Sequence, residues 1–345
     1  MKAIEYNSYG GPEVMEINEV PTPQPAANEM LVRINTTTVT NTEAKFRQGK
    51  PYLTRLFTGL FRPRLKRLGE ELAGEVVEVG DAVTRFKVGD RVFGTAGPHF
   101  GANAEYICLP EEAVLTRTPT NLSDAESVSS IDGFLTALPF LRDMGQIRDG
   151  HKVLIVGGSG SIGTSAIQIA KYYGAQVTAV CSTGKVAKVK RLGADHVIDY
   201  RKQDFTKSDE KYDIIFDAVG KTNFSQCKEL LSPKGRFLEV DVNLDTLCSM
   251  VRTSLSSQQK VFFAATGLRK PEERLRDLYL LEELLEAEII RPVIDRSFSM
   301  VDIVAAHRYV DQGHKMGNVV VNIALESVRE RISKSLDAIS LTEFA

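Results

Sequence analysis

Hydrophobic residues in the first 120 positions form short runs, rich in β-branched side chains, which glycines and prolines separate. The runs are KAIEY, EMLVRINTTTV, ELAGEVVEVG, DRVFGTAG and NAEYICLP. Runs of this length predict β-strands, and helical spacing is suggested only near residues 43–47. This part of the chain should therefore be mostly β.

The pattern changes at about residue 123. Ser123 and Asp124 are a helix start signal, and helical spacing continues to Asp143. Strand-like runs then alternate with helical segments; these runs are KVLIV, AQVTAV, HVID, YDIIFDAV, GRFLEV and KVFFAA. Because such alternation is typical of a parallel sheet with helices on both faces, this region predicts an α/β fold with a doubly wound sheet.

The last part of the chain returns to the β-rich pattern. An acidic helical segment over residues 271–288 precedes strand-like runs at residues 291–300 and 317–324. We infer that these runs complete the first domain, and that the charged tail is a loose helix or disordered. The expected boundaries are 1–123 and 268–325 for the β-rich domain, 124–267 for the parallel-sheet domain, and 326–345 for the tail.

Composition excludes several classes of protein. The 345 residues are 43% hydrophobic and 26% charged, as in ordinary soluble proteins, and contain neither a signal-peptide pattern nor an 18-residue apolar run. A cytoplasmic protein without a membrane partner is expected. The net charge of −2 argues against a nucleic-acid partner. One basic run, Phe61 to Arg67, stands out and is interpreted first as a solvated loop.

Cysteines and histidines are dispersed along the chain. The four cysteines form no C-x-x-C, and no metal-ligand spacing of the H-E-x-x-H type occurs. We expect unpaired thiols and no metal site.

The stretch VLIVGGSGSIGTSAIQIA, residues 153–170, joins an apolar strand-like run to a helical one. As a mononucleotide P-loop it lacks the essential lysine, since Thr164 stands in that place. As a dinucleotide turn it has Gly157, Gly160 and Gly163 for the tight bend, the approach of the pyrophosphate and the helix packing. The second interpretation predicts that Ser159, Ser161 and Ile162 also line the cofactor.

The next predicted strand indicates which dinucleotide binds. It ends at Cys181 without the carboxylate that usually accepts hydrogen bonds from the ribose of NAD. Ser182, Thr183 and Lys185 follow instead, which favours the 2′-phosphate of NADPH. The alternative for Lys185 is that it only caps an exposed helix.

Several motifs occur in one order over residues 1 to about 324. They are MKAIEYNSYGGPEVMEI, GEELAGEVVEVGDAVTRFKVGDRVFG, AEYICLPEEAV, the glycine turn, LGADHVIDYR, YDIIFDAVG and AHRYVDQGHKMGNVVV. In these motifs the chain resembles the zinc-free quinone oxidoreductase branch of the medium-chain dehydrogenase/reductase superfamily. The resemblance implies a GroES-like catalytic domain built from both chain ends, a Rossmann domain, a cleft between them and a homodimer.

The resemblance also implies roles for individual residues. Lys185 and Tyr200 would hold the 2′-phosphate, Thr136 would meet the nicotinamide end, and Val219 with Gly220 would end the fourth strand beside it. Zinc-dependent relatives carry a histidine where this chain has Glu70, and a cysteine near the N-T-E region, where this chain has none. The resemblance therefore implies chemistry without zinc.

The chain departs from the family where substrate chemistry is expected. Family members often show N-x-x-D-x-x-x-R-x-G. In this chain Thr40 stands in place of the Asn and Glu43 in place of the Asp. We expect hydride transfer from NADPH to a small quinone or α,β-unsaturated carbonyl, with solvent able to protonate a quinone. Glu43 and Tyr52 are candidate catalytic proton donors for an enone; Glu43 could equally be a solvated helix residue.

Other functions stay open at this point. They are enoyl-thioester or aldehyde/alcohol oxidoreduction within the same superfamily, and NADPH binding with little turnover. The segment from Tyr52 to Arg67 mixes aromatic and basic residues. It is interpreted either as a lid that favours an acidic or amphiphilic acceptor, or as simple surface packing.

Overall fold

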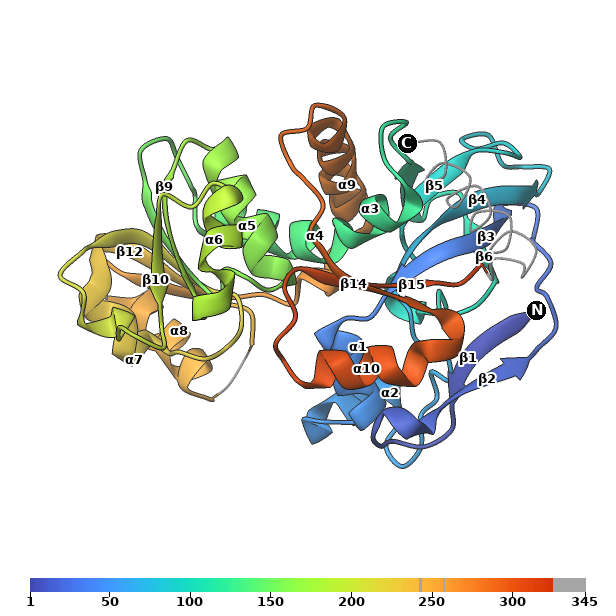
Figure 1. Cartoon of the computed structure of the whole chain (residues 1–345), viewed down its shortest axis with the longest axis horizontal. Helices are drawn as coiled ribbons and strands as arrows, with labels where there is room; N and C mark the ends of the chain where they lie inside the picture. Colours follow the sequence, from blue (N-terminus) through green and yellow to red (C-terminus); the bar gives the residue numbers. More distant parts are fainter. Residues whose placement is uncertain (242–243, 257, 325–345) are drawn as a thin grey trace, which may run out of the picture.

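The computed structural model describes residues 1–241, 244–256 and 258–324; the predicted tail, 326–345, lies outside them. The described chain forms a parallel-sheet part and a β-rich part side by side (Figure 1). No helix among these residues is long and apolar enough to cross a bilayer.

The parallel-sheet part has the strand order β10-β9-β8-β11-β12-β13, and all pairs are parallel. The strands are β8 (Lys152–Val156), β9 (Gln176–Cys181), β10 (His196–Asp199), β11 (Tyr212–Asp217), β12 (Leu231–Glu239) and β13 (Lys260–Phe263). The helices are α5 (Ser161–Tyr172), α6 (Val186–Arg191), α7 (Phe224–Cys227) and α8 (Leu244–Ser256). The predicted doubly wound sheet is confirmed, and its order reverses between β8 and β11, where α/β proteins bind ligands.

Strand β8 shows why the sheet is covered on both faces. Val153 and Ile155 pack in one core cluster with residues of α5, whereas Leu154 and Val156 pack in another with residues of α7. Since successive side chains of a strand point to opposite faces, both faces of β8 are buried. This burial explains the continuous apolar run KVLIV.

The β-rich part contains a seven-stranded sheet of order β14-β15-β3-β4-β5-β7, with β6 paired to β3, and a separate β1-β2 pair. The strands are β1 (Lys2–Tyr6), β2 (Met15–Glu19), β3 (Glu29–Thr38), β4 (Glu71–Val79), β5 (Arg91–Thr95), β6 (Tyr106–Pro110), β7 (Val114–Arg117), β14 (Ile294–Ser299) and β15 (Asn318–Asn322). Strand β15 pairs with β3 through Val320 and Thr38. The C-terminal strands β14 and β15 therefore belong to the same sheet as the N-terminal strand β3, and the expected GroES-like architecture is present.

Helices join and flank the two parts. They are α1 (Asn41–Gln48), α2 (Arg55–Thr58), α3 (Asp124–Ser129), α4 (Ile131–Pro139), α9 (Pro271–Glu286) and α10 (Ile303–Asp311). Helix α4 packs on α5 so closely that a Cβ on Gly133 would lie 2.5 Å from the Ser161 carbonyl oxygen. Helix α9 contacts both α4 and β7. Close helix contacts thus connect the two parts.

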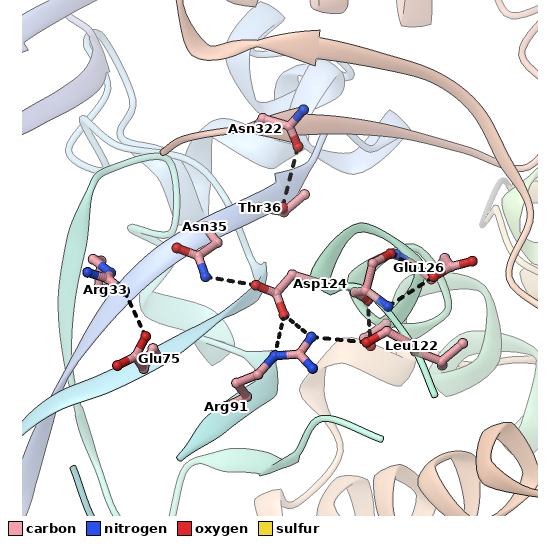
Figure 2. A network of polar contacts seen from close by, with 11 residues as sticks. Arg33, Asn35, Thr36, Glu75, Arg91, Leu122, Asp124, Glu126 and Asn322 are labelled. Carbon is pink, nitrogen blue, oxygen red and sulfur yellow. Dashed lines mark hydrogen bonds and ion pairs between the residues drawn. The ribbon is translucent and has the colours of Figure 1, made fainter. Parts of the chain in front are cut away.

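Asp124 fixes the point where the chain leaves the β-rich sheet (Figure 2). Its carboxylate accepts hydrogen bonds from Asn35 of β3 at 2.7 Å and from Arg91 of β5 at 2.6 Å. Ser123 and Glu126 form a capping box at the same helix end, which confirms the predicted start signal. These contacts tie α3 to the sheet that it follows.

Candidate cofactor cleft

The glycine turn follows β8 directly and leads into α5. Gly157 has φ of 81°, and a Cβ there would lie 2.4 Å from a methyl group of Val219. A Cβ on Gly163 would lie 2.2 Å from the Gly157 carbonyl oxygen. Two of the three glycines are therefore required by close packing around the turn.

Gly160 is the N-cap of α5 and differs from the other two. Its φ of −78° suits any residue, and the only atom near a Cβ would be the Gly157 carbonyl oxygen at 3.7 Å. No side chain caps this helix end. No side chain therefore occupies the N–H groups at the positive dipole end of α5, which suits a dinucleotide pyrophosphate.

The start of β15, in the β-rich part, lies against the glycine turn. The Gly317 N–H donates to the Ser159 carbonyl oxygen at 2.9 Å. The Ser161 hydroxyl lies 2.8 Å from Asp132 and 2.7 Å from the side-chain oxygen of Asn318. Ser159 and Ser161 therefore join the two parts of the molecule. Ile162, in the first turn of α5, is half-buried.

Lys185 of the parallel-sheet part contacts the segment that precedes β15. Its Nζ donates to the carbonyl oxygens of His314 at 2.7 Å and Lys315 at 3.0 Å, and burial lowers the pKa of this ammonium group. The alternative that Lys185 only caps an exposed helix is wrong. An ammonium group that neutral carbonyl groups hold remains able to pair with an anion.

The other residues predicted around the 2′-phosphate lie at neighbouring strand ends. Ser182 and Thr183 follow β9, and Tyr200 follows β10, with a side chain 52% exposed. A hydrogen bond from the Thr183 side chain lowers the pKa of Asp199, so the Thr183 hydroxyl is already engaged. The structure brings this group to the same sheet edge as Lys185.

Asp217 was missed by the sequence interpretation. This buried residue ends β11, and its carboxylate accepts hydrogen bonds from the N–H groups of Val219, Gly220, Lys221 and Thr222. The Thr222 hydroxyl adds another at 2.8 Å. Asp217 thereby shapes the loop in which Val219 and Gly220 were predicted to face the cofactor. Its signal was an aspartate at the end of an apolar strand run.

Lys315 was also missed. Its side chain is almost completely buried, and its Nζ donates to the Gly317 carbonyl oxygen at 2.9 Å. Burial lowers the pKa of Lys315, while Asp132, Asp295 and Glu71 oppose that effect. A second ammonium group thus lies beside the segment that contacts the glycine turn. A single lysine in GHKMGN gave no sequence signal of this burial.

Thr136 was predicted to meet the nicotinamide end of the cofactor. It is half-buried on α4, the helix that packs against α5 behind the glycine turn. This position puts it on an element that borders the cleft, and its contact with the cofactor stays a prediction.

Carboxylates occupy the region in which a zinc site would be sought. Glu70 pairs with Arg274 at 2.6 Å, and Glu71 accepts a hydrogen bond from the Thr38 hydroxyl at 2.6 Å. Burial raises the pKa of Glu71 well above its usual range. No group of three or more His, Cys, Asp or Glu side chains is arranged for a metal within the described part of the chain.

Glu43 is completely buried, so its interpretation as a solvated helix residue is wrong. It forms a capping box with Thr40, and its carboxylate also accepts hydrogen bonds from the Gly69 N–H and, at 3.2 Å, from Asn103. Burial raises its pKa to about 7. These contacts favour a structural role, and proton donation by Glu43 stays a prediction that its burial disfavours.

Tyr52, the other candidate donor, is 69% exposed on the turn that precedes α2. The Arg55 guanidinium lies 5.0 Å from the centre of its ring. Proton donation by Tyr52 likewise stays a prediction.

Two family models match the chain: an alcohol dehydrogenase GroES-like domain over residues 26–120 and a zinc-binding dehydrogenase over residues 192–321. A chloroplastic quinone-oxidoreductase, QR1, from Triphysaria versicolor is 30% identical over 93% of this chain and 98% of its own length. A chloroplastic NADPH-dependent alkenal/one oxidoreductase from Arabidopsis thaliana is 29% identical over 93% and 79%. The solved quinone oxidoreductase from Coxiella burnetii superposes with a TM-score of 0.83 at 28% identity, covering 94% of this chain and 99% of that one.

Proposed function

Because the chain belongs to the quinone oxidoreductases of the medium-chain dehydrogenase/reductase superfamily, we propose that it uses NADPH to reduce a quinone or an α,β-unsaturated carbonyl compound. The observation that carries the proposal is the start of α5 at Gly160, which no side chain caps and where a Cβ would have only one atom within 4 Å. A helix start of this kind suits a pyrophosphate at the point where the strand order reverses.

The residues of the cleft have distinct roles in this proposal. The glycine turn holds the pyrophosphate, Lys185 and Tyr200 hold the 2′-phosphate, and the loop shaped by Asp217 lies beside the nicotinamide end. Bound NADPH supplies the hydride. The protein orients the reactants and excludes water from them, and a quinone can take its proton from solvent.

We propose that the reaction needs no zinc. Glu70, which stands where zinc-dependent relatives carry a histidine, forms an ion pair with Arg274. Thr40, in the first position of the family motif N-x-x-D-x-x-x-R-x-G, accepts a hydrogen bond from the Glu43 N–H and caps α1. Both side chains are engaged in structural contacts. A homodimer and a cytoplasmic location stay predictions from the sequence, and light scattering after size-exclusion chromatography would check the first.

An acceptor screen tests the proposed activity. We expect NADPH oxidation above the protein-free rate with 9,10-phenanthrenequinone or a simple enone, unchanged by a chelator, because hydride transfer to these acceptors needs no Lewis acid. Turnover of a crotonyl thioester but of no quinone or enone would favour enoyl-thioester reduction. Turnover of aldehydes alone, lost with the chelator, would favour a zinc dehydrogenase, and NADPH binding without turnover would favour a binding protein.

Replacing Lys185 with alanine should raise the KM for NADPH about tenfold or more, because a charge-assisted contact with one phosphate contributes ~1.5–3 kcal/mol. The KM for NADH should change much less, since NADH lacks the 2′-phosphate. The substitution also removes the hydrogen bonds from Lys185 to the carbonyl oxygens of His314 and Lys315. Loss of these bonds should affect the KM for NADH and for NADPH alike, so the KM for NADH measures that effect by itself.

Steady-state kinetics with both cofactors measures the effect. Lys190→Ala, at an exposed position on α6, is the matched control and should change neither KM. An equal rise for NADPH and NADH in Lys185→Ala would refute 2′-phosphate recognition.

A further inference from the structure

Exposed apolar side chains gather in one segment of the β-rich part, residues 50–67, which we name the basic-apolar segment. Tyr52 is 69% exposed, Leu56 67%, Leu60 55% and Phe61 88%. Among the large apolar side chains whose exposure the structure describes, that of Phe61 is the most exposed. Because soluble proteins usually expose such side chains singly, a group of this kind indicates an interaction surface.

The same segment is strongly basic. No Asp or Glu occurs between residues 44 and 69, in a chain that has 45 acidic residues in all. Arg67 pairs with Glu5 at 2.9 Å, but Arg62, Arg64 and Lys66 are exposed and pair with no acidic side chain in the described part of the chain. The segment therefore presents positive charge beside its apolar side chains.

Hydrogen bonds hold the segment in a defined shape. The Tyr9 hydroxyl lies 2.7 Å from the Thr58 hydroxyl and donates to the Gly59 carbonyl oxygen at 2.5 Å. The Arg64 N–H donates to the Thr58 carbonyl oxygen at 2.7 Å, which closes a turn around Leu60 and Phe61. These two side chains are thus held outward at the tip of an anchored turn.

We propose that the basic-apolar segment docks the protein on a lipid surface that contains anionic phospholipids. Phe61, Leu60 and Leu56 would enter the boundary between headgroups and acyl chains, while the unpaired arginines and Lys66 would attract the anionic headgroups. An outward turn, with its apolar side chains at the tip, suits insertion into such a boundary. The expectation of no membrane partner rested on the lack of a spanning segment, and surface docking departs from it.

The lid interpretation of this segment is separate. A cofactor-ordered lid would move with NADPH, whereas lipid docking needs neither NADPH nor an acceptor. Helix α1 joins the segment to the cleft, because Lys45 on α1 pairs at 2.7 Å with Asp241, next to Gly220. Docking through residues 50–67 would hold this side of the cleft near the bilayer, where lipophilic quinones dissolve.

Vesicle sedimentation tests the proposal with the full chain. We expect the protein to sediment with phosphatidylcholine vesicles that contain about 30% phosphatidylglycerol, and much less with phosphatidylcholine alone, because a basic residue near an anionic surface contributes about a fivefold gain in binding. Binding should weaken in about 0.5 M salt, where charges are screened.

Variants at the tip locate the binding surface. Leu60→Ser/Phe61→Ser should lower the partition coefficient about tenfold or more, and Arg62→Gln/Arg64→Gln about 25-fold, at fivefold for each charge removed. The matched controls are Leu268→Ser, 70% exposed, and Lys190→Gln/Lys234→Gln at exposed positions of the parallel-sheet part. These controls should bind as the unchanged protein does, and thermal unfolding of each variant confirms that it is folded.

Three results would overturn the proposal: no greater sedimentation with anionic than with neutral vesicles, full binding by folded tip variants, or equal losses in the controls. The first result would leave the acceptor screen untouched, so failure of docking and failure of the proposed activity can be told apart.

Discussion

Replacing Gly160 with aspartate should abolish NADPH binding and leave the fold intact. The φ and ψ of −78° and 177° suit an L-residue, and the nearest atom to the new Cβ would be the Gly157 carbonyl oxygen at 3.7 Å. Aspartate is also a favourable N-cap residue, so the free energy of unfolding should not fall. Its charge would face the pyrophosphate, and two like charges about 4 Å apart repel by ~4 kcal/mol near a protein surface, about a thousandfold in Kd.

Isothermal titration calorimetry with NADPH measures this loss, and thermal unfolding measures the fold. Gly160→Ala is the control, because a methyl group fits the space and carries no charge; its effect on Kd should be far smaller. Near-normal NADPH affinity in the aspartate variant would show that the phosphates bind elsewhere. Unfolding of both variants would show instead that Gly160 has a structural role.

The parallel sheet could be predicted because its strands are buried on both faces. Continuous apolar runs such as KVLIV and the helical segments between them carry this signal locally. The glycine turn could also be predicted from one short stretch of sequence, because its strand, turn and helix are consecutive in the chain. The alternation implied a helix between GRFLEV and KVFFAA but gave no residue range for it. The exposed Leu247 and Val251 of α8 show why: the apolar residues of this helix do not form a clean buried stripe.

Contacts across the cleft could not be predicted from local patterns. Lys185 was placed correctly beside β9, but its bonds to His314 and Lys315 join residues far apart in the chain. The burial of Lys315 depends on the same tertiary packing. Sequence reasoning therefore identified the glycine turn and the end of β9, but not the residues of the β-rich part that contact them.

Glu43 was misinterpreted for a different reason. Thr40 and Glu43 have the spacing of a capping box, which was a usable local signal. The sequence did not show that the Gly69 N–H and the Asn103 side chain donate hydrogen bonds to the Glu43 carboxylate. The region that departs from the family motif thus serves to fix helix α1 in the structure, and Arg47 belongs to the same arrangement.

Replacing Asp311 with asparagine should lower the free energy of unfolding by about 3–5 kcal/mol, because it leaves the buried guanidinium of Arg47 without its counter-charge. The Arg47 side chain is completely buried and pairs with the Asp311 carboxylate at 2.6 Å. Its Nη1 donates to the Gly10 carbonyl oxygen at 3.1 Å. His307 nearby cannot supply the counter-charge, because imidazole is either neutral or cationic; burial, and secondarily the charge of Arg47, lower its pKa to about 3 and keep it neutral.

Urea unfolding of Asp311→Asn measures the loss. Glu75→Gln is the matched control, because it breaks the exposed pair with Arg33, 2.7 Å apart, and should cost at most about 1 kcal/mol. In the double variant Arg47→Met/Asp311→Leu, apolar side chains replace both charges and should recover much of the stability, since the cost arises from an unpaired buried charge. A loss in Asp311→Asn no larger than in Glu75→Gln would show that the ion pair does not hold α1 against α10.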